Sequence, residues 1–196
     1  DLIAQAISRG IGVMALTDIN NTMGMIDFVK MCGENGIKPV AGAEFRNGDH
    51  HLYTGLAKNN AGFRELNELI TSCNLNKADF KADPDAFNNV FVIYPYGSRR
   101  KEQLRENEFI GIRPGDTGKL FTSEFSHDQS KLVIMHPVTF KDKIGYILHK
   151  NLRAIDHNTL ISKLSPEQFA LQNETMLPVD SLVMHYEDYP HIVKNT

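Results

Sequence analysis

The sequence has no tryptophan and only two cysteines, Cys32 and Cys73. These cysteines lack the paired spacing of a zinc site, so we expect two buried thiols in a reducing cytoplasm rather than a disulfide. No apolar run approaches the ~20 residues that a membrane-spanning helix needs, and no membrane segment is predicted. The formal net charge of −3 gives no general attraction to a polyanion, which disfavours a basic nucleic-acid-binding domain.

A length of 196 residues with 41% hydrophobic content is typical of one globular domain with a full core. We therefore predict a single domain over residues 1–196. Helical spacing is already present from Asp1 to Arg9, and a helical pattern is still running from Tyr189 to Thr196. We expect the chain to be part of a longer protein.

The spacing of apolar residues predicts helices and short strands in alternation. Such alternation implies a largely parallel sheet covered by helices, either doubly wound or closed into a barrel. The Asn47-Gly48-Asp49 turn adds one β-hairpin. The predicted strands cover residues 13–16, 37–45, 51–57, 90–94, 109–113 and 132–136, and the predicted helical stretches cover 2–9, 23–33, 60–73, 101–107, 116–121 and 142–156.

Polar residues at the ends of these strands are the candidates for a functional site. Functional groups in parallel α/β folds gather at the carboxyl ends of the strands. Asp, Glu and His side chains that meet there could bind Mg²⁺, Mn²⁺ or Zn²⁺. The competing interpretation is structural, because any such fold places polar residues there to satisfy backbone groups. The candidates are Asp18, Asn20, Glu44, Tyr94, Arg113 and His136.

Several motifs in the sequence resemble those of a known family. Ala15-Leu-Thr-Asp18 ends a strand, Gly36-Ile-Lys-Pro39 and Gly42-Ala-Glu44 form the next strand, and Leu56-Ala-Lys-Asn59 leads into a helix. In this order and spacing they are similar to the PHP (polymerase and histidinol phosphatase) domain at the N-terminus of bacterial DNA polymerase III alpha subunits. The resemblance continues through residues 132–140 and 148–162 and covers nearly the whole chain.

The resemblance implies an α/β fold of the PHP type, a distorted (βα)7 barrel. It implies that the first strand lies upstream of Asp1 and that the polymerase palm begins after the end of this chain. Active PHP domains hold up to three metal ions with histidines and carboxylates and hydrolyse phosphoesters. The implied function is the N-terminal PHP domain of a DNA-directed DNA polymerase, a nucleotidyltransferase of DNA replication, with a structural or partner-docking role.

The resemblance places metal-ligand positions at Asp18, Glu44 and, in the late motif, around His136. The family's histidine after the first aspartate is Ile19 in this chain, which has no donor atom. The late aspartate and histidine positions fall on Pro137 and Thr139. His136 stands where the family usually has asparagine.

Loss of these ligands predicts a degenerate and empty metal site. Carboxylates left without cations must repel one another or find other partners. Arg113 is a candidate partner for Glu44. Asp18 is expected to cap a helix or to accept hydrogen bonds from the turn formed by Asn20, Asn21 and Thr22. Any of these three turn residues can cap the following helix. His51, beside the hairpin turn, is expected to face solvent.

Because these ligands are lost, no cofactor is expected in this domain. The resemblance implies that the Mg²⁺ of the polymerase belongs to the palm outside this chain. The implied partners are the polymerase palm and thumb in cis, the proofreading exonuclease subunit in some family members, and DNA through the full-length protein. One alternative is an active phosphoesterase or proofreading 3'-5' exonuclease that holds Zn²⁺ or Mn²⁺ on Asp18, Glu44, His136 and the family's His-x-His motif, which is expected upstream of Asp1. Another is a free-standing interaction or regulatory domain.

Overall fold

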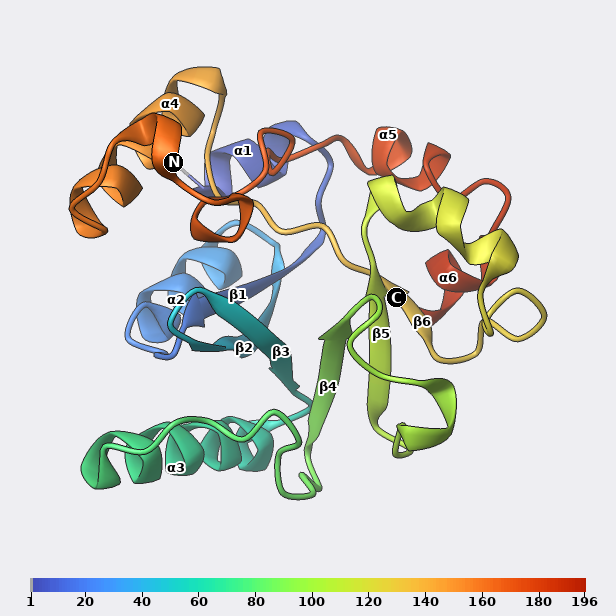
Figure 1. Ribbon diagram of the computed structural model, residues 1–196. Helices are drawn as coiled ribbons and strands as arrows, with labels where there is room; N and C mark the ends of the chain where they lie inside the picture. Colours follow the sequence, from blue (N-terminus) through green and yellow to red (C-terminus); the bar gives the residue numbers. More distant parts are fainter. Residues whose placement is uncertain (1) are drawn as a thin grey trace.

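The computed structural model describes residues 2–196, in which six strands form one curled sheet with helices packed around it (Figure 1). The strands are β1 (Val13–Ile19), β2 (Lys38–Asn47), β3 (His50–Ala57), β4 (Val90–Pro95), β5 (Glu108–Ile112) and β6 (Leu132–Ile134). The α-helices are α1 (Leu2–Ser8), α2 (Met25–Glu34), α3 (Asn60–Asn76), α4 (Lys143–Asp156), α5 (Val179–Met184) and α6 (Pro190–Asn195). Short 3-10 helices cover Lys101–Gln103, Pro114–Thr122, Ile161–Lys163 and Pro166–Gln168.

The strands cross the sheet in chain order, from β1 at one edge to β6 at the other. β1 is parallel to β2, and β4, β5 and β6 are parallel to one another, whereas β3 is antiparallel to both neighbours. The predicted hairpin causes this reversal, and Gly48 in its turn has a φ of 58°, which favours glycine. The sheet curls into a half-barrel, which confirms the predicted α/β fold of the PHP type (Figure 1).

The two faces of the sheet have different surroundings. On the side that we call the covered face, α2 packs on β2 and α3 packs on β2, β3 and β4. The opposite side is the inner face of the half-barrel. Because side chains alternate along a strand, residues that pair in register across neighbouring strands lie on the same face. The strand register therefore assigns each side chain to one face or the other.

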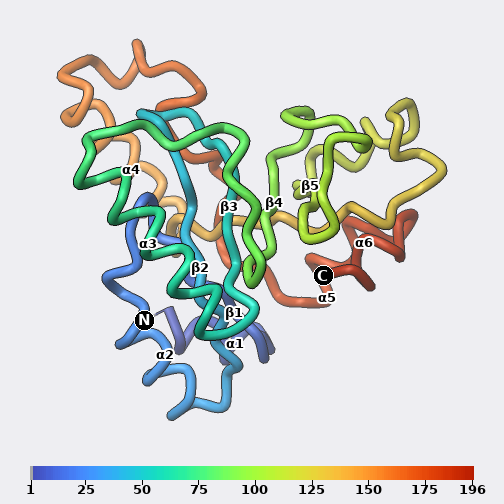
Figure 2. Tube along the Cα trace, turned by 90° about the horizontal axis from the view of Figure 1, so that it is seen from below, coloured from blue at the N-terminus to red at the C-terminus, as the bar shows by residue number. Residues whose placement is uncertain are grey.

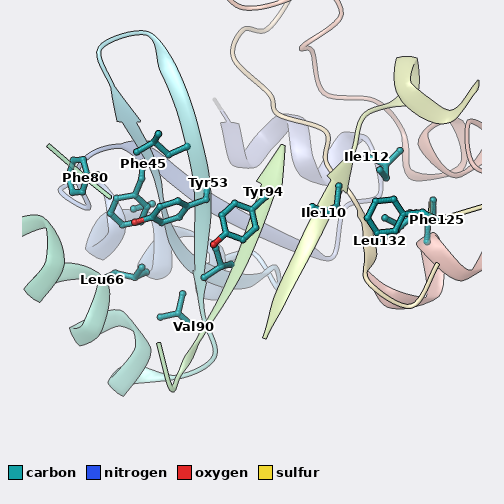
Figure 3. Close-up of a cluster of buried hydrophobic side chains, with 14 of the residues drawn as sticks. Phe45, Tyr53, Leu66, Phe80, Val90, Tyr94, Ile110, Ile112, Phe125 and Leu132 are labelled. Carbon is teal, nitrogen blue, oxygen red and sulfur yellow. The ribbon is translucent and has the colours of Figure 1, made fainter. Parts of the chain in front are cut away.

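The covered face carries the larger hydrophobic core (Figure 3). The rings of Phe45 and Tyr53 lie 4.8 Å apart between centroids, and Phe80 meets Phe45 edge-on at 5.1 Å. Leu66 of α3 is fully buried against them. A Cβ added at Gly55 of β3 would lie 2.7 Å from Leu66 Cδ2, so this strand needs glycine for α3 to approach closely.

A second core joins α1 and α2 to the first two strands. Its buried residues are Ile3, Ala6, Met25, Phe28, Cys32, Ile37 and Met176. Cys32 is a buried free thiol, as predicted, and burial raises its pKa. Cys73 is also free but only half-buried.

The start of α2 differs from the prediction. Its N-cap is Gly24, which forms no side-chain cap hydrogen bond, so the expectation that Asn20, Asn21 or Thr22 caps this helix is wrong. Thr22 instead donates to the side chain of Asn67 on α3 at 2.6 Å. These polar side chains therefore lie in a longer loop before the helix begins at Met25.

The predicted helical stretch over residues 101–107 is also shorter than expected. Only Lys101–Gln103 forms a 3-10 turn. The carboxylate of Glu108 accepts a hydrogen bond from the Arg105 N–H at 2.8 Å, which holds the chain in a turn directly before β5. The predicted stretch at 116–121 is helical, as part of a 3-10 helix.

Two connections lie against each other as they cross the molecule (Figures 1 and 2). One leaves β6 at Ile134, two residues before the predicted strand end, and leads to α4. The other, residues 169–178, leads back to α5. The N–H groups of Thr139 and Phe140 donate to the carbonyl of Glu174, at 2.9 and 3.3 Å, and join the two connections.

α4 is attached to the body by one side only. Asp142 caps it by accepting from the Gly145 N–H at 2.9 Å. On the attached side, Arg153 pairs with Asp49 at the hairpin turn. The opposite side is apolar and exposed, and comprises Ile144, Ile147, Leu148, Leu152 and Ile155. Within residues 2–196, no helix combines the length and the apolar character needed to cross a membrane.

Candidate functional site

Asp18, the first predicted ligand, lies near the end of β1. In the parallel ladder Asp18 pairs with Ala43, and the next residue, Ile19, pairs with Glu44. Asp18 and Glu44 therefore lie on opposite faces of the sheet. A Cβ added at Gly24 would lie 3.2 Å from Asp18 Oδ2, which places this carboxylate on the covered face beside the first turn of α2.

Asp18 does not act as the predicted acceptor for the turn that follows it. Within residues 2–196 the structure gives its carboxylate no hydrogen bond. Asn20 organises this turn instead. Its φ of 54° is left-handed, its side chain donates to the carbonyl of Arg46 at 2.9 Å, and it accepts from the Arg46 N–H at 2.8 Å. Asn20 thus fixes the backbone of β2 next to Glu44.

Glu44 lies on the inner face and pairs with Arg46 of the same strand. The Glu44 side chain is 13% exposed and the Arg46 side chain 27%. Residues two apart on a strand share a face, so this pair is favoured by local geometry. The prediction that Arg113 is the partner of Glu44 is wrong, because the guanidinium group of Arg46 on the same strand pairs with Glu44.

Arg113 pairs with Glu174, a buried acid that the sequence analysis missed. Arg113 Nη1 donates to Glu174 Oε1 at 2.8 Å, and the Glu174 side chain is 9% exposed. Thr139 Oγ1 donates to Glu174 Oε2 at 2.6 Å, and the Leu171 N–H donates to Oε1 at 3.2 Å. Thr139, at a predicted degenerate ligand position, therefore donates a hydrogen bond to a carboxylate. No strand precedes Glu174, so the strand-end rule could not find it.

His136, the third predicted ligand position, is also engaged. Its Nε2 lies 2.9 Å from the carbonyl oxygen of Thr175, in the connection that returns to α5. Pro137, which has no donor atom, follows it directly. His136 thus helps to hold the two crossing connections together.

The charged groups of this region influence two histidines, His51 and His149. Burial lowers the pKa of His51; Glu44 opposes that shift, and Arg46 and Arg113 add to it. The expectation that His51 faces solvent is wrong, because a β-bulge between Phe45 and Arg46 pairs it with Arg46 on the inner face.

His149 of α4 has a similar environment. Burial lowers its pKa, Arg153 and Arg46 lower it further, and Glu174 raises it. Its Nε2 accepts a hydrogen bond from the Ala170 N–H at 3.0 Å. We call Glu44, Arg46, His51, Arg113 and Glu174 the inner cluster.

Tyr94, the remaining candidate, belongs to the covered face. Its ring lies among the buried side chains (Figure 3), 6.0 Å from that of Tyr53. Its hydroxyl donates to Glu108 at 3.3 Å. Burial raises the pKa of Tyr94 well above its usual range. Tyr94 is therefore a core residue.

The donor set does not fit the metal ions that active PHP domains hold. Asp18 and Glu44 lie on opposite faces, Glu44 is neutralised by Arg46, and Ile19 offers no donor atom. Nowhere in the described part of the chain do three His, Cys, Asp or Glu side chains gather in an arrangement that could hold a metal ion. Two or three bridged cations need several converging ligands, and residues 2–196 place Asp18 and Glu44 on opposite faces.

Comparison with known proteins gives a consistent picture. The family model described as "PHP domain" matches residues 1–136. The chain is 42% identical over 249 residues to an error-prone DNA polymerase of Symbiobacterium thermophilum, an alignment that covers 100% of this chain and 22% of that protein. It is 32% identical over 82 residues to a DNA polymerase III subunit alpha of Neisseria meningitidis serogroup A, covering 39% of this chain and 7% of that protein. A DNA polymerase III subunit alpha of Vibrio cholerae is 36% identical over 80 residues, covering 38% of this chain and 7% of that protein. The chain therefore spans less than a quarter of the length of these relatives.

Proposed function

The chain belongs to the PHP domain family, and on this premise we propose that it is the PHP portion of a bacterial DNA polymerase, with a structural and docking role and no metal chemistry of its own. The polymerase activity, a nucleotidyl transfer in DNA replication, would belong to the rest of the polypeptide. The relatives' names support this assignment, since those compared are an error-prone DNA polymerase and subunits of DNA polymerase III.

The observation that carries the proposal is the pairing of Glu44 with Arg46. A carboxylate that already faces a guanidinium group has its charge neutralised, so a divalent cation would have to displace the arginine to bind. Asp18 on the other face cannot supply a second oxygen to the same ion. We propose that Asp18, Glu44 and His136 are vestigial ligand positions and that Ile19, Pro137 and Thr139 mark lost ones.

The exposed apolar side of α4 supports a docking role. Five aliphatic side chains face outward from a helix whose other side is held by Arg153 and His149. Exposed apolar surface of this kind is typical of protein interaction sites. We propose the polymerase palm and thumb in cis as the main partners. The proofreading exonuclease subunit, and DNA through the full-length protein, are further proposed partners, in the cytoplasm.

Metal analysis of the purified chain tests the proposal. After dialysis against Zn²⁺ or Mn²⁺, we expect metal well below one equivalent per chain and no turnover of a phosphodiester substrate. Asp18→Ala and Glu44→Gln variants should match the unmodified chain in both assays. Stoichiometric metal together with turnover that Asp18→Ala abolishes would establish the alternative, an active phosphoesterase or 3'-5' exonuclease.

The coding sequence beyond Thr196 provides a second test. A polymerase palm with paired aspartates is expected there, because palm carboxylates hold the Mg²⁺ of nucleotidyl transfer. A stop codon at this point would favour the alternative of a free-standing interaction domain.

A further inference from the structure

Two nearly buried carboxylates on the inner side of the half-barrel each face one arginine. Glu44 pairs with Arg46, and Glu174 pairs with Arg113. A carboxylate removed from water costs free energy unless opposite charge and hydrogen bonds compensate it. The two guanidinium groups supply that charge, and the cluster is balanced with two positive and two negative groups.

Both arginines are held in place by the surrounding chain. The side chain of Asn20 bonds to both the N–H and the carbonyl of Arg46, at 2.8 and 2.9 Å. Arg113 follows β5 directly, and its partner Glu174 also accepts from Thr139 and from the Leu171 N–H. The pairs are therefore part of a hydrogen-bonded frame rather than loose surface contacts.

The two pairs influence the pKa values of the same two histidines, His51 and His149. Arg46 and Arg113 both lower the pKa of His51, and Arg46 and Glu174 both affect the pKa of His149. Charges from β2, from the end of β5 and from the returning connection therefore influence the same two histidines. The Arg113–Glu174 pair itself lies where the two connections meet, because Thr139 of one connection also donates to Glu174 of the other.

We propose that Arg46 and Arg113 form an internal guanidinium brace that neutralises Glu44 and Glu174 in place of bound cations, with the Arg113–Glu174 pair tying the returning connection to the end of β5. The inference rests on the proposed function in one respect, namely that the site holds no metal. A brace of this kind makes stability independent of metal supply, because arginine is always charged and is covalently part of the chain.

Thermal unfolding of single and double variants tests the brace. Arg46→Met leaves Glu44 without its counter-charge, and Arg113→Met does the same to Glu174. For each we expect the midpoint to fall by about 4–8 °C, since the pairs are largely but not fully buried. The matched control is Arg64→Met, which removes an exposed pair with Glu68 on α3 and should shift the midpoint by less than about 2 °C.

Removing both charges of one pair should restore much of the loss. Glu44→Gln/Arg46→Met has no uncompensated carboxylate, so we expect its midpoint to lie clearly above that of Arg46→Met alone. If Arg46→Met does not fold, Arg46→Lys tests the same point, because its ammonium group retains the charge but cannot reproduce the guanidinium geometry. It should then fold with an intermediate midpoint.

The outcomes separate the brace from the proposed function. If Arg46→Met and Arg113→Met unfold like the control Arg64→Met, the brace is refuted and the metal-free assignment stands. If the unmodified chain binds Zn²⁺ or Mn²⁺ stoichiometrically and loses stability in a chelator, both are refuted. A loss in the single variants that the double variant recovers, with no effect of chelator, supports the brace.

Discussion

The two faces of the sheet bury their side chains by different physical means. On the covered face, Phe45, Tyr53, Leu66 and other apolar residues pack against α3 and need only shape and volume to match. On the inner face, Glu44 and its neighbours are polar and need specific partners at specific positions. Apolar burial tolerates many solutions, whereas polar burial depends on each contact being made.

The largest effect is expected from a truncation on the covered face. Phe45→Ala removes a fully buried ring that contacts Tyr53 and Phe80, and should lower the free energy of unfolding by about 3–5 kcal/mol. Phe91→Ala is the matched change on the inner face, where the ring is 41% exposed, and should cost less than about 2 kcal/mol. Urea unfolding measured by circular dichroism compares the two. Equal losses would show that the faces do not differ in packing.

The covered face was largely predictable from the sequence because it follows periodicity. The strands and α3 lie close to where their apolar spacing placed them, and α3 begins at the Asn59 cap, whose side chain accepts from the Gly62 N–H. The Asn47-Gly48-Asp49 signal gave the correct hairpin. These features depend on local patterns, which a single sequence contains.

The inner face was predicted only in part, because its contacts join residues far apart in the chain. The strand-end rule and the family motif both identified Glu44, but its partner Arg46 followed from neither. Glu174 lies 61 residues from Arg113 and carries no periodic signal. His51 was expected to face solvent. The β-bulge at Arg46, which turns the His51 side chain toward the inner face, leaves no recognisable pattern in the sequence.

An intermediate effect is expected at Asn20, which joins the end of β1 to the backbone of β2 beside Glu44. Asn20→Ala removes both hydrogen bonds to Arg46 and places a non-glycine residue without local bonding at a φ of 54°. We expect a loss of about 1–2 kcal/mol in the free energy of unfolding. Asn20→Gly also loses both bonds but tolerates the backbone angle, so it should lose less. If the two variants are equally destabilised, the left-handed conformation contributes nothing measurable.

The smallest effect concerns His149, which tests whether polar contacts at the crossing connections respond to pH. Its pKa is lowered from the ordinary value of 6.5 by burial and by Arg153 and Arg46, against the opposing influence of Glu174. The unfolded chain therefore binds the proton more readily, so this contribution to stability is fully present above pH 6.5 and is lost as the pH falls toward the folded pKa. Protonation would also remove the lone pair that accepts from the Ala170 N–H.

Urea unfolding between pH 7 and pH 5 measures this contribution. His149→Gln retains a carbonyl acceptor but does not titrate, so its stability should fall less steeply over this range than that of the unmodified chain. His127→Gln, at an exposed position, is the matched control and should leave the slope unchanged. Because a neutral imidazole is required to accept from Ala170, an unchanged slope in His149→Gln would mean that the attachment of α4 does not depend on this hydrogen bond. The pH sensitivity of the polar side would then have to arise from another group, and His51 is the next to test because burial lowers its pKa as well.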